Sequence, residues 1–480
     1  MSPLGIGFLL LSAAFFAELV YKQGFSMGML ALVAMIAMPT VYCIVAFPHF
    51  GIMVLLTIAY LLFFIMKIGI DFPFGTLMDG LQYMLILSFF IKQKREPNWQ
   101  ILKGPISVII LIWVGYNFMQ IGNPVAESRL AWVYTIRTIA VVMLMYFVFL
   151  VHIRSLSFLR IIINLWLTLA LFGALYTLKQ EFIGFSASEE AWLHSDPIIA
   201  DLLFIDGHWR KAGIFSDPVA FAYNMIASIM LCLGLMTGPV SLGKKIWLGG
   251  LALIYTWSMM YSGTRGAYVL LPAGLMMFAI LKFSKKMILP LVAVSLMFGA
   301  LIVVPTGNGT IKRFQSAFRP NEDESYKLRK YNQKRIQPFM LSHPIGAGLG
   351  SAGAWGRRFS PGSFLAHFEV DSGLVRTTVE MGWIGLALFL SFMFIALKTG
   401  INNYFTIKDP ELKTYCFTMV LILFSLYVGN FPQEAFVQFP INIYLYLVIA
   451  VIVITKQLDD EKEKAEIVIS SKTGRDYFFS

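Results

Sequence analysis

The sequence is poor in charge, since only 14% of its 480 residues are Asp, Glu, Lys or Arg whereas 58% are hydrophobic. A soluble domain carries roughly 25% charged residues, so this composition excludes an ordinary soluble protein. Cysteine is also scarce, because Cys43, Cys232 and Cys416 are the only three, and each lies in an apolar stretch. These cysteines predict neither a disulfide framework nor a zinc site.

Motifs for common cofactors are missing as well. The sequence contains no phosphate loop of the Walker type, no dinucleotide fingerprint and no paired-histidine metal motif. Its basic residues are dispersed among the ends of apolar stretches, where membrane insertion already accounts for them. We therefore expect no metal, no other cofactor and no nucleic-acid partner.

Long apolar stretches dominate the sequence instead. A transmembrane helix needs about 20 such residues, and the chain offers about fourteen stretches, with twelve as the lower bound. They are 5–21, 26–47, 50–67, 77–91, 104–121, 131–151, 160–178, 218–237, 246–262, 266–281, 287–304, 372–397, 414–430 and 438–455. Period-two alternation typical of a membrane barrel is absent. The sequence thus predicts an all-α polytopic membrane protein.

The distribution of Lys and Arg predicts the orientation, because cytoplasmic loops attract these residues. With the N-terminus in the cytoplasm, the internal connections contain 14 Lys and Arg, whereas the short outer connections contain little beyond Lys22, Arg129 and Arg265. An even number of spans then returns the C-terminus to the cytoplasm. Two long polar segments are then external. The predicted divisions are 1–178 and 218–304 (membrane), 179–217 (first external loop), 305–371 (second external loop), 372–455 (membrane) and 456–480 (cytoplasmic tail).

The two external loops differ in charge. The first contains three basic and seven acidic residues, and the second contains ten basic and five acidic residues. Long loops cross the membrane largely regardless of charge, so the basic excess needs another explanation. Three explanations are open. The basic residues belong to an exposed amphipathic helix over 322–335, they form an electrostatic funnel for an anionic ligand, or they bind phospholipid headgroups.

Two outward-facing patterns surround arginines. Before the span at 218, Asp217 and Pro218 suit a helix start, but they leave Arg210 unexplained. Arg265, followed by Gly266, lies in a tight hairpin between two spans. That arginine either extends to lipid headgroups or presents its planar guanidinium to phosphate oxygens.

A third pattern is the glycine-rich stretch that begins at His343. A histidine before proline is more typical of a turn than of a catalyst, and glycine at this density supplies turns. The glycines are Gly346, Gly348 and Gly350.

The fourth pattern follows the second external loop. Asp371 and Ser372 suit a helix cap, and Gly382 and Gly385 suit close helix packing. Glu380 lies nine residues beyond Asp371, which places the two near opposite faces of one predicted helix. A carboxylate inside the membrane is by default a functional candidate.

In this order and with these loop lengths, the four patterns resemble the O-antigen ligase and O-antigen polymerase superfamily of bacterial cell-envelope enzymes, over about residues 200–395. The ligase branch typically has histidine where this chain has Asp371, and His367 stands four residues earlier. This departure favours a polymerase or a related glycan transferase. The resemblance rests on Arg210, Gly213, Phe215, Pro218, Arg265, Gly266, His343, Gly346, Gly348, Gly350, Ser372, Gly382 and Gly385.

The resemblance implies an inverting, metal-independent glycosyltransferase with a GT-C-like architecture on the outer face of the bacterial cytoplasmic membrane. Its donor would be a glycan on a polyprenyl diphosphate such as undecaprenyl diphosphate, and its acceptor a saccharide or a lipid-linked glycan. The product would be an O-antigen of lipopolysaccharide or an exopolysaccharide, and other polysaccharide assembly proteins are candidate partners.

The resemblance also implies roles for individual residues. Arg210 and Arg265, with Lys211 beside them, would stabilise the leaving diphosphate. Asp371 would deprotonate the acceptor hydroxyl. His367 and Glu380 are the alternative catalytic residues.

Two other classes remain open. A lipid-linked glycan flippase would have a similar number of spans, but two similar halves with broken helices are expected of it, and the sequence contains no such repeat. A non-catalytic assembly or sensor protein is the third class. Formation of a glycosidic bond by the purified protein separates all three.

The lack of a metal motif gives a first prediction. Glycan transfer by the purified protein should continue at an unchanged rate in excess EDTA, because fixed guanidinium groups can neutralise a leaving diphosphate without a metal. The measurement is the initial rate with and without chelator, followed by added Mg²⁺. A rate that falls with EDTA and returns with Mg²⁺ would contradict the prediction.

Overall fold

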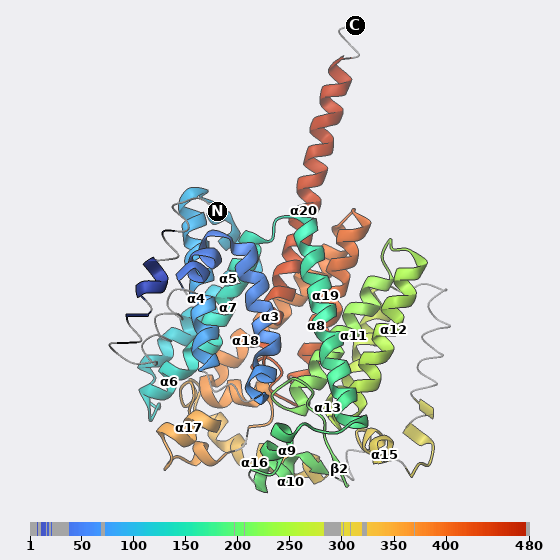
Figure 1. Cartoon of the computed structure of the whole chain (residues 1–480). Coiled ribbons are helices and arrows are strands. Elements are labelled where there is room, and N and C mark those ends of the chain that lie inside the picture. The colour runs from blue at the N-terminus through green and yellow to red at the C-terminus, as the bar shows by residue number, and fades with distance from the viewer. Residues whose placement is uncertain are drawn as a thin grey trace.

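The computed structural model describes residues 38–68, 73–195, 197–205, 207–282, 299–300, 302–307, 309–318, 324–368 and 370–476, together with positions 7, 11–15, 17–18 and 21. Within these residues the chain is a bundle of helices with a single pair of two-residue strands (Figure 1).

The first part of the chain forms α3 (Pro48–Lys67), α4 (Phe74–Arg95), η1 (Trp99–Lys103), α5 (Pro105–Met119), η2 (Gln120–Gly122), α6 (Arg129–Ile136), the π-helix η3 (Arg137–Val141), α7 (Val142–His152) and α8 (Leu156–Phe182). The first polar segment forms α9 (Ala187–Leu193), α10 (Pro197–Leu203), β1 (Phe204–Ile205) and β2 (His208–Trp209). The two strands pair antiparallel, with Phe204 opposite Trp209.

The second part forms α11 (Pro218–Met236), α12 (Leu242–Met260), α13 (Arg265–Leu281), α15 (Gly309–Ser316), α16 (Glu324–Ser342), α17 (Gly353–Phe359), η5 (Phe364–His367), α18 (Gly373–Thr406), α19 (Pro410–Gly429) and α20 (Ile441–Asp476).

Nine of the helices in the described ranges are long and apolar enough to cross a membrane, when α5 is counted with η2 and α6 with η3 and α7. The others in this group are α3, α4, α8, α11, α18, α19 and α20. They confirm the prediction of an all-α polytopic membrane protein. Helices α12 and α13 match two further predicted spans, although α13 is shorter. The predicted spans 5–21, 26–47 and 287–304 lie partly outside the described residues, so the total of about fourteen stays a prediction.

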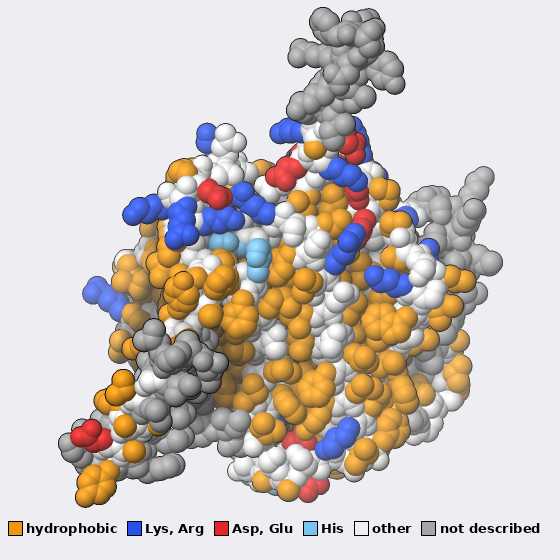
Figure 2. Space-filling model, turned by 45° about the horizontal axis from the view of Figure 1, so that its top comes forward, with side chains coloured by type: hydrophobic (Ala, Val, Ile, Leu, Met, Phe, Trp, Pro, Cys, Tyr) orange, Lys and Arg blue, Asp and Glu red, His pale blue; other side chains and the backbone are white. Residues whose placement is uncertain are grey.

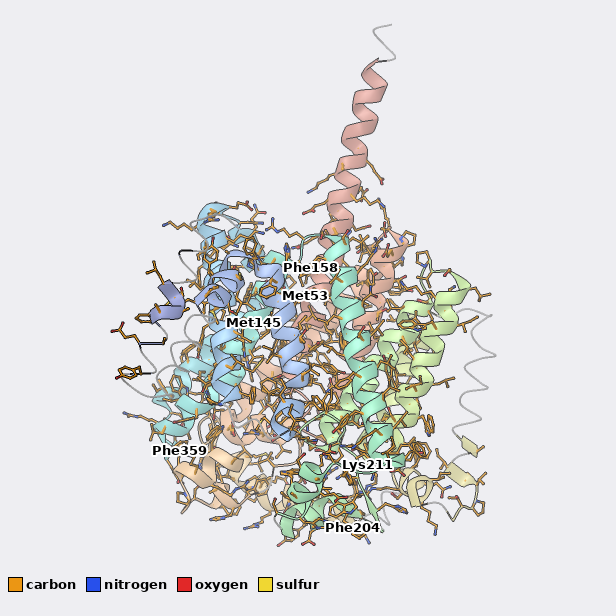
Figure 3. The ribbon with its side chains drawn as sticks, in the orientation of Figure 1. Met53, Met145, Phe158, Phe204, Lys211 and Phe359 are labelled. Atoms are coloured by element: carbon orange, nitrogen blue, oxygen red, sulfur yellow. The ribbon has the colours of Figure 1, made fainter. Side chains whose placement is uncertain are left out.

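Helix α11 lies at the centre of the bundle, where it packs against α12 and α19, and α19 in turn packs against α20. Glycine permits the close approach of α11 and α19, because a Cβ at Gly234 would lie 2.3 Å from Oγ1 of Thr418. Small residues at such crossings are typical of membrane helices, whose association depends on close packing. The side chains fill the space between these helices (Figure 3).

The last helix is longer than the sequence analysis predicts, because the predicted tail from 456 continues α20 as far as Asp476. Lys456 pairs with Asp460 at 2.7 Å, one helical turn further on, and such pairs support an exposed helix. Asp459 is buried, and its carboxylate accepts hydrogen bonds from the backbone N–H groups of Lys408 and Asp409. This carboxylate fastens the α18–α19 connection to α20.

The described parts of both polar segments lie at the same end of the bundle. Figure 1 shows α9, α10, α15, α16 and α17 at the end opposite to the projecting part of α20. Lys and Arg side chains gather around the end from which α20 projects, above a belt of hydrophobic side chains (Figure 2). The sequence analysis predicts that this end is cytoplasmic, and the orientation stays a prediction.

Helix α18 is broken at Gly382, whose φ of 67° and ψ of −166° are not helical. The break removes helical donors from the carbonyls of residues 379, 380 and 381. The first two accept from Ala347 N and Gly348 N, each at 2.9 Å, and the third accepts from the Tyr116 hydroxyl at 2.7 Å. The glycine-rich segment and α5 therefore supply hydrogen bonds at the break. They do so inside the protein, where irregular backbone is tolerated at membrane depth.

A methyl group at Gly382 should destabilise the protein. An added Cβ would lie 2.0 Å from the Pro344 carbonyl oxygen, and alanine is strained at this positive φ. We expect Gly382→Ala to lower the free energy of unfolding by at least about 2 kcal/mol, measured as a lower melting temperature in detergent.

Gly115→Ala is the matched control, because an added Cβ at Gly115 in α5 meets nothing within 4 Å and alanine is the better helix former. Equal melting temperatures for Gly382→Ala and the unchanged protein would show that the break does not depend on this glycine.

Candidate functional site

Two arginines hold the hairpin between α12 and α13 from separate polar segments. Arg210 Nε donates to the Ser262 carbonyl at 3.0 Å, and its Nη2 donates to Thr264 Oγ1 at 3.1 Å. Arg313, on α15, donates from Nε to the Gly263 carbonyl at 2.8 Å. The tight turn that the sequence predicts is thus held by arginines that converge on its backbone carbonyls.

The predicted diphosphate ligand Arg265 lies at the start of α13, within electrostatic range of Arg210. Burial, followed by the positive charge of Arg313, lowers the pKa of Arg210 to about 10. The guanidinium still carries its charge at neutral pH. The positive charges of Arg313 and Arg265 both act on Arg210, and a buried guanidinium beside other cations favours an anionic ligand there.

Asp217 supplies the negative charge in this cluster. Its Oδ1 accepts from the N–H groups of Val219 and Ala220, so it caps α11 as predicted, with Pro218 in the first turn. The Thr264 hydroxyl donates to the Pro218 carbonyl at 3.0 Å. The start of α11 is therefore fastened to the same hairpin as Arg210.

Lys211 and Gly213 have other partners. The Lys211 ammonium lies 3.5 Å from the Glu181 carboxylate and over the Phe185 ring, and burial lowers its pKa. Gly213 has a φ of 56°, and its N–H donates to Gln180 Oε1 at 2.9 Å. Both residues fix the first polar segment to the end of α8 (Figure 3).

Asp371 lines a pocket of about 280 Å³ between α16 and the start of α18. Its Oδ2 lies 3.5 Å from Nε of Arg329, and its side chain is 45% exposed. Lys330, Phe431 and Pro432 line the same pocket. A carboxylate and two cations thus face one space that is open to solvent.

This pocket and the arginine hairpin are neighbours. A Cβ at Gly266 would lie 3.8 Å from Cγ of Pro432, which lines the pocket. Arg210 and Arg265 are not among the described residues that line it. The structure therefore places the two arginines and Asp371 at the same end of the bundle, on either side of the 431–432 turn.

The two histidines make local contacts. His367 is exposed, and its Nε2 lies 2.9 Å from the Pro361 carbonyl oxygen. The His343 ring stacks on Phe339 with centroids 4.0 Å apart, and its Nδ1 lies 2.9 Å from the Phe339 carbonyl oxygen. His343 therefore lies between the end of α16 at Ser342 and the glycine-rich segment.

The glycines of the third and fourth patterns meet one another. A Cβ at Gly346 would lie 2.5 Å from the Glu380 carbonyl oxygen, and one at Gly385 would lie 3.3 Å from the Tyr116 ring. Gly348 and Gly350 approach α6 and the turn before it, since a Cβ at either would come within 2.7 Å of Ala126 or Thr135. At each of these four positions a Cβ would come too close to atoms of a neighbouring segment, so glycine is required there.

Glu380 is buried, 1% exposed, and belongs to a cluster that the sequence analysis missed. Arg376 Nε donates to Glu380 Oε1 at 3.2 Å, and Arg376 Nη1 donates to Glu434 Oε2 at 2.7 Å. The four-residue spacing of Arg376 and Glu380 was the available signal. Glu434 arrives from the α19–α20 connection, which no local pattern predicts.

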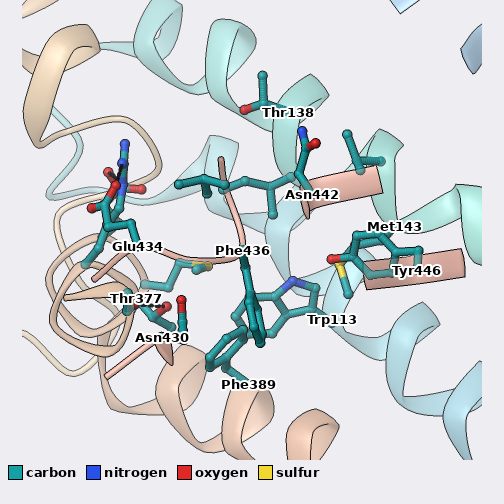
Figure 4. Close-up of a pocket in the computed structure, with 17 residues that line it drawn as sticks. Trp113, Thr138, Met143, Thr377, Phe389, Asn430, Glu434, Phe436, Asn442 and Tyr446 are labelled. Carbon is teal, nitrogen blue, oxygen red and sulfur yellow. Dashed lines mark hydrogen bonds and ion pairs between the residues drawn. The ribbon is translucent and has the colours of Figure 1, made fainter. Parts of the chain in front are cut away.

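The predicted placement of Asp371 and Glu380 on opposite faces of one helix is wrong. Helix α18 begins at Gly373, with Ser372 as its cap, so Asp371 precedes the helix. A cavity of about 70 Å³ lies beside the Arg376–Glu380–Glu434 cluster, and Trp113, Phe389 and Phe436 form part of its wall (Figure 4).

Glu434 gives the cluster a pH dependence. Two carboxylates share one arginine, and Glu434 Oε1 is buried without a hydrogen-bond partner in the described structure. Burial raises the pKa of Glu434, although Arg376 opposes the shift. The folded protein therefore holds this proton to a higher pH than the unfolded chain, whose glutamate ionises near 4.5.

Stability should consequently decrease as pH rises from about 4.5 through the raised pKa, because the native state binds more protons than the unfolded state there. Glu434→Gln should flatten that part of the profile of melting temperature against pH. Glu190→Gln, at an exposed position of α9, is the control. A slope that is unchanged by Glu434→Gln would assign the pH dependence to another group.

Comparison with known proteins agrees with this geometry. Residues 250–390 match the family model described as O-Antigen ligase, a range that contains the Arg265 hairpin, the glycine-rich segment, Asp371 and the broken part of α18. No curated protein matches the chain. The family supports a membrane protein that joins or polymerises glycans in general. The match confirms the resemblance to the O-antigen ligase and O-antigen polymerase superfamily that the four sequence patterns predict.

Proposed function

We propose that this protein transfers or polymerises glycan units from a polyprenyl diphosphate carrier at the outer face of the bacterial cytoplasmic membrane. The observation that carries the proposal is the position of the Asp371 pocket beside the hairpin that Arg210, Arg265 and Arg313 surround. A base and an anion-binding group are the two components that such a transfer requires.

In the proposed step, an acceptor hydroxyl oxygen attacks the anomeric carbon of the donor sugar. The bond from that carbon to the phosphate oxygen breaks, polyprenyl diphosphate leaves with the electron pair, and the hydroxyl proton passes to Asp371. A single displacement inverts the anomeric configuration. Charge that develops on the leaving diphosphate is stabilised by guanidinium groups already in place.

Arg329 and Lys330 extend the predicted set of cations. Both line the Asp371 pocket, and both come from the second polar segment, whose basic excess the sequence analysis left with three explanations. Their position favours the electrostatic funnel for an anionic ligand. It also places cations on the Asp371 side of the 431–432 turn, where the donor phosphates would face the base.

The contacts of the remaining candidates support positioning roles. Lys211 pairs with Glu181, and Glu380 is enclosed with Arg376 behind the start of α18. His367 lies against the Pro361 carbonyl. We therefore assign proton transfer to Asp371 alone and the support of the 430–434 turn to the buried cluster.

One observation favours the alternative, a lipid-linked glycan transporter. Transporters bind substrate at broken helices with buried charges, and α18 is broken next to Arg376 and Glu380. Purified protein supplied with a lipid-linked donor decides between them. An enzyme releases polyprenyl diphosphate and a longer glycan, whereas a transporter in vesicles moves the donor and leaves it intact.

Arg210→Ala and Arg265→Ala should each reduce glycan transfer by about 10²-fold or more at normal protein abundance, which is the loss typical of removing one transition-state donor. The measurement is the initial rate of polyprenyl diphosphate release. Arg95→Ala, exposed at the other end of the bundle, should retain the full rate. A full transfer rate in both Arg210→Ala and Arg265→Ala would show that the diphosphate does not bind at the hairpin.

A further inference from the structure

A second pocket on the outer end, of about 140 Å³, lies between the turn before α6 and the second polar segment. This volume is roughly ten times the space that one water centre needs, so the pocket can hold a larger ligand. Its polar lining includes Glu127, Ser128, Ser351 and Ser363, and its aromatic lining is Phe339 and Phe364. None of these residues has a part in the proposed transfer step.

The serines of this pocket have hydrogen-bonding capacity to spare. Ser351 Oγ is buried and has no partner among the described residues. Ser128 Oγ and Ser363 Oγ accept from the N–H groups of Ala131 and Leu365, so each hydroxyl keeps its proton for another acceptor. Glu127 is exposed and adds a carboxylate that accepts from hydroxyl donors.

The phenyl rings add an apolar surface to these hydroxyls. Phe339 and Phe364 both line the pocket, and Phe364 is 43% exposed. No Lys, Arg or His is among the described residues that line it, in contrast to the Asp371 pocket with Arg329 and Lys330. Arg335 lies outside the lining, over the Phe364 ring, with its guanidinium carbon 4.8 Å from the ring centroid. The lining itself offers hydroxyls and phenyl surface, which suit a neutral ring with hydroxyl groups and a C–H face.

The glycine-rich segment builds the pocket. Ala347, Leu349 and Ser351 alternate with its glycines and line the wall. A Cβ at Gly350 would lie 2.7 Å from the Ala131 carbonyl oxygen, so glycine lets this wall approach α6. One wall comes from the glycine-rich segment and the other from α6 and the turn before it. Backbone contact between them fixes the width of the pocket.

The pocket also adjoins the proposed reaction site. Leu365 lines the serine pocket and Phe368 lines the Asp371 pocket, and both belong to one small apolar cluster with Val379. A glycan that extends across the outer surface from Asp371 would pass over η5 to reach the serines.

We infer that this serine pocket is a glycan subsite, which binds a neutral sugar unit of the substrate at a distance from the bond that is made. The inference rests on the proposed function for the identity of its ligand. The hydroxyls of Ser128, Ser351 and Ser363 donate to sugar oxygens, Glu127 accepts from sugar hydroxyls, and the two phenyl rings contact the C–H face.

Binding of a phosphate-free oligosaccharide tests the subsite apart from catalysis. The probe is the neutral repeat-unit oligosaccharide released by mild acid from the polysaccharide of the host cell and treated with phosphatase. Titration calorimetry on the full-length protein in detergent measures its Kd. Ser351→Ala should weaken binding about 2- to 10-fold and Glu127→Ala about 10-fold or more, in line with neutral and charged hydrogen bonds.

Ser342→Ala and Glu190→Ala are the matched controls, since Ser342 and Glu190 are exposed residues of the two polar segments outside the pocket; both variants should bind like the unchanged protein. Asp371→Asn should also keep the affinity while it loses transfer. Inorganic pyrophosphate should leave oligosaccharide binding unchanged, because the arginine hairpin and the serine pocket are separate sites.

The subsite proposal is wrong if Ser351→Ala and Glu127→Ala bind the oligosaccharide with the same affinity as the unchanged protein. It is also wrong if the unchanged protein transfers glycan but does not bind the oligosaccharide. Selective loss of affinity in these two variants would support it even in a protein that releases no polyprenyl diphosphate. In that case the proposed transfer fails and the sugar site stands.

Discussion

The break in α18 is the constraint on which the end of the molecule that holds both polar segments depends. A membrane helix that stops and restarts leaves backbone carbonyls without donors, and hydrocarbon offers none. The carbonyls of residues 379–381 are satisfied by Ala347, Gly348 and Tyr116, so the long polar segment must return to the bundle at this place. That return ends α16 near the start of α18, positions Arg329 against Asp371 and forms one wall of the serine pocket.

Charge is arranged around this constraint in two different ways. At the hairpin, the charges of Arg313, Asp217 and Arg265 all act on the buried Arg210. In the buried cluster, two carboxylates share Arg376, and burial raises the pKa of the Glu434 carboxyl. Both clusters border the 430–434 turn, since Pro432 lies near Gly266 and Glu434 pairs with Arg376.

Composition and apolar length predict the helical membrane fold, because both are properties of single segments. The motifs likewise predict the tight turn between α12 and α13 and the helix cap at Asp217. The sequence does not predict the pairings between segments. It does not show which of the ten basic residues in the second polar segment reaches the hairpin, or that Glu434 pairs with Arg376. Nor does it show that the third and fourth patterns hydrogen-bond to each other. Each of these is decided by where the chain folds back, a long-range property that local spacing does not encode.

Helix α20 links the two ends of the molecule in one piece. It runs unbroken for 36 residues from the end of the α19–α20 connection, a length of about 54 Å, and Asp459 fastens it to the start of α19 on the way. The turn that carries Glu434 and the projecting part of α20 are therefore joined by one continuous helix, and a kink anywhere along it would change the distance between them.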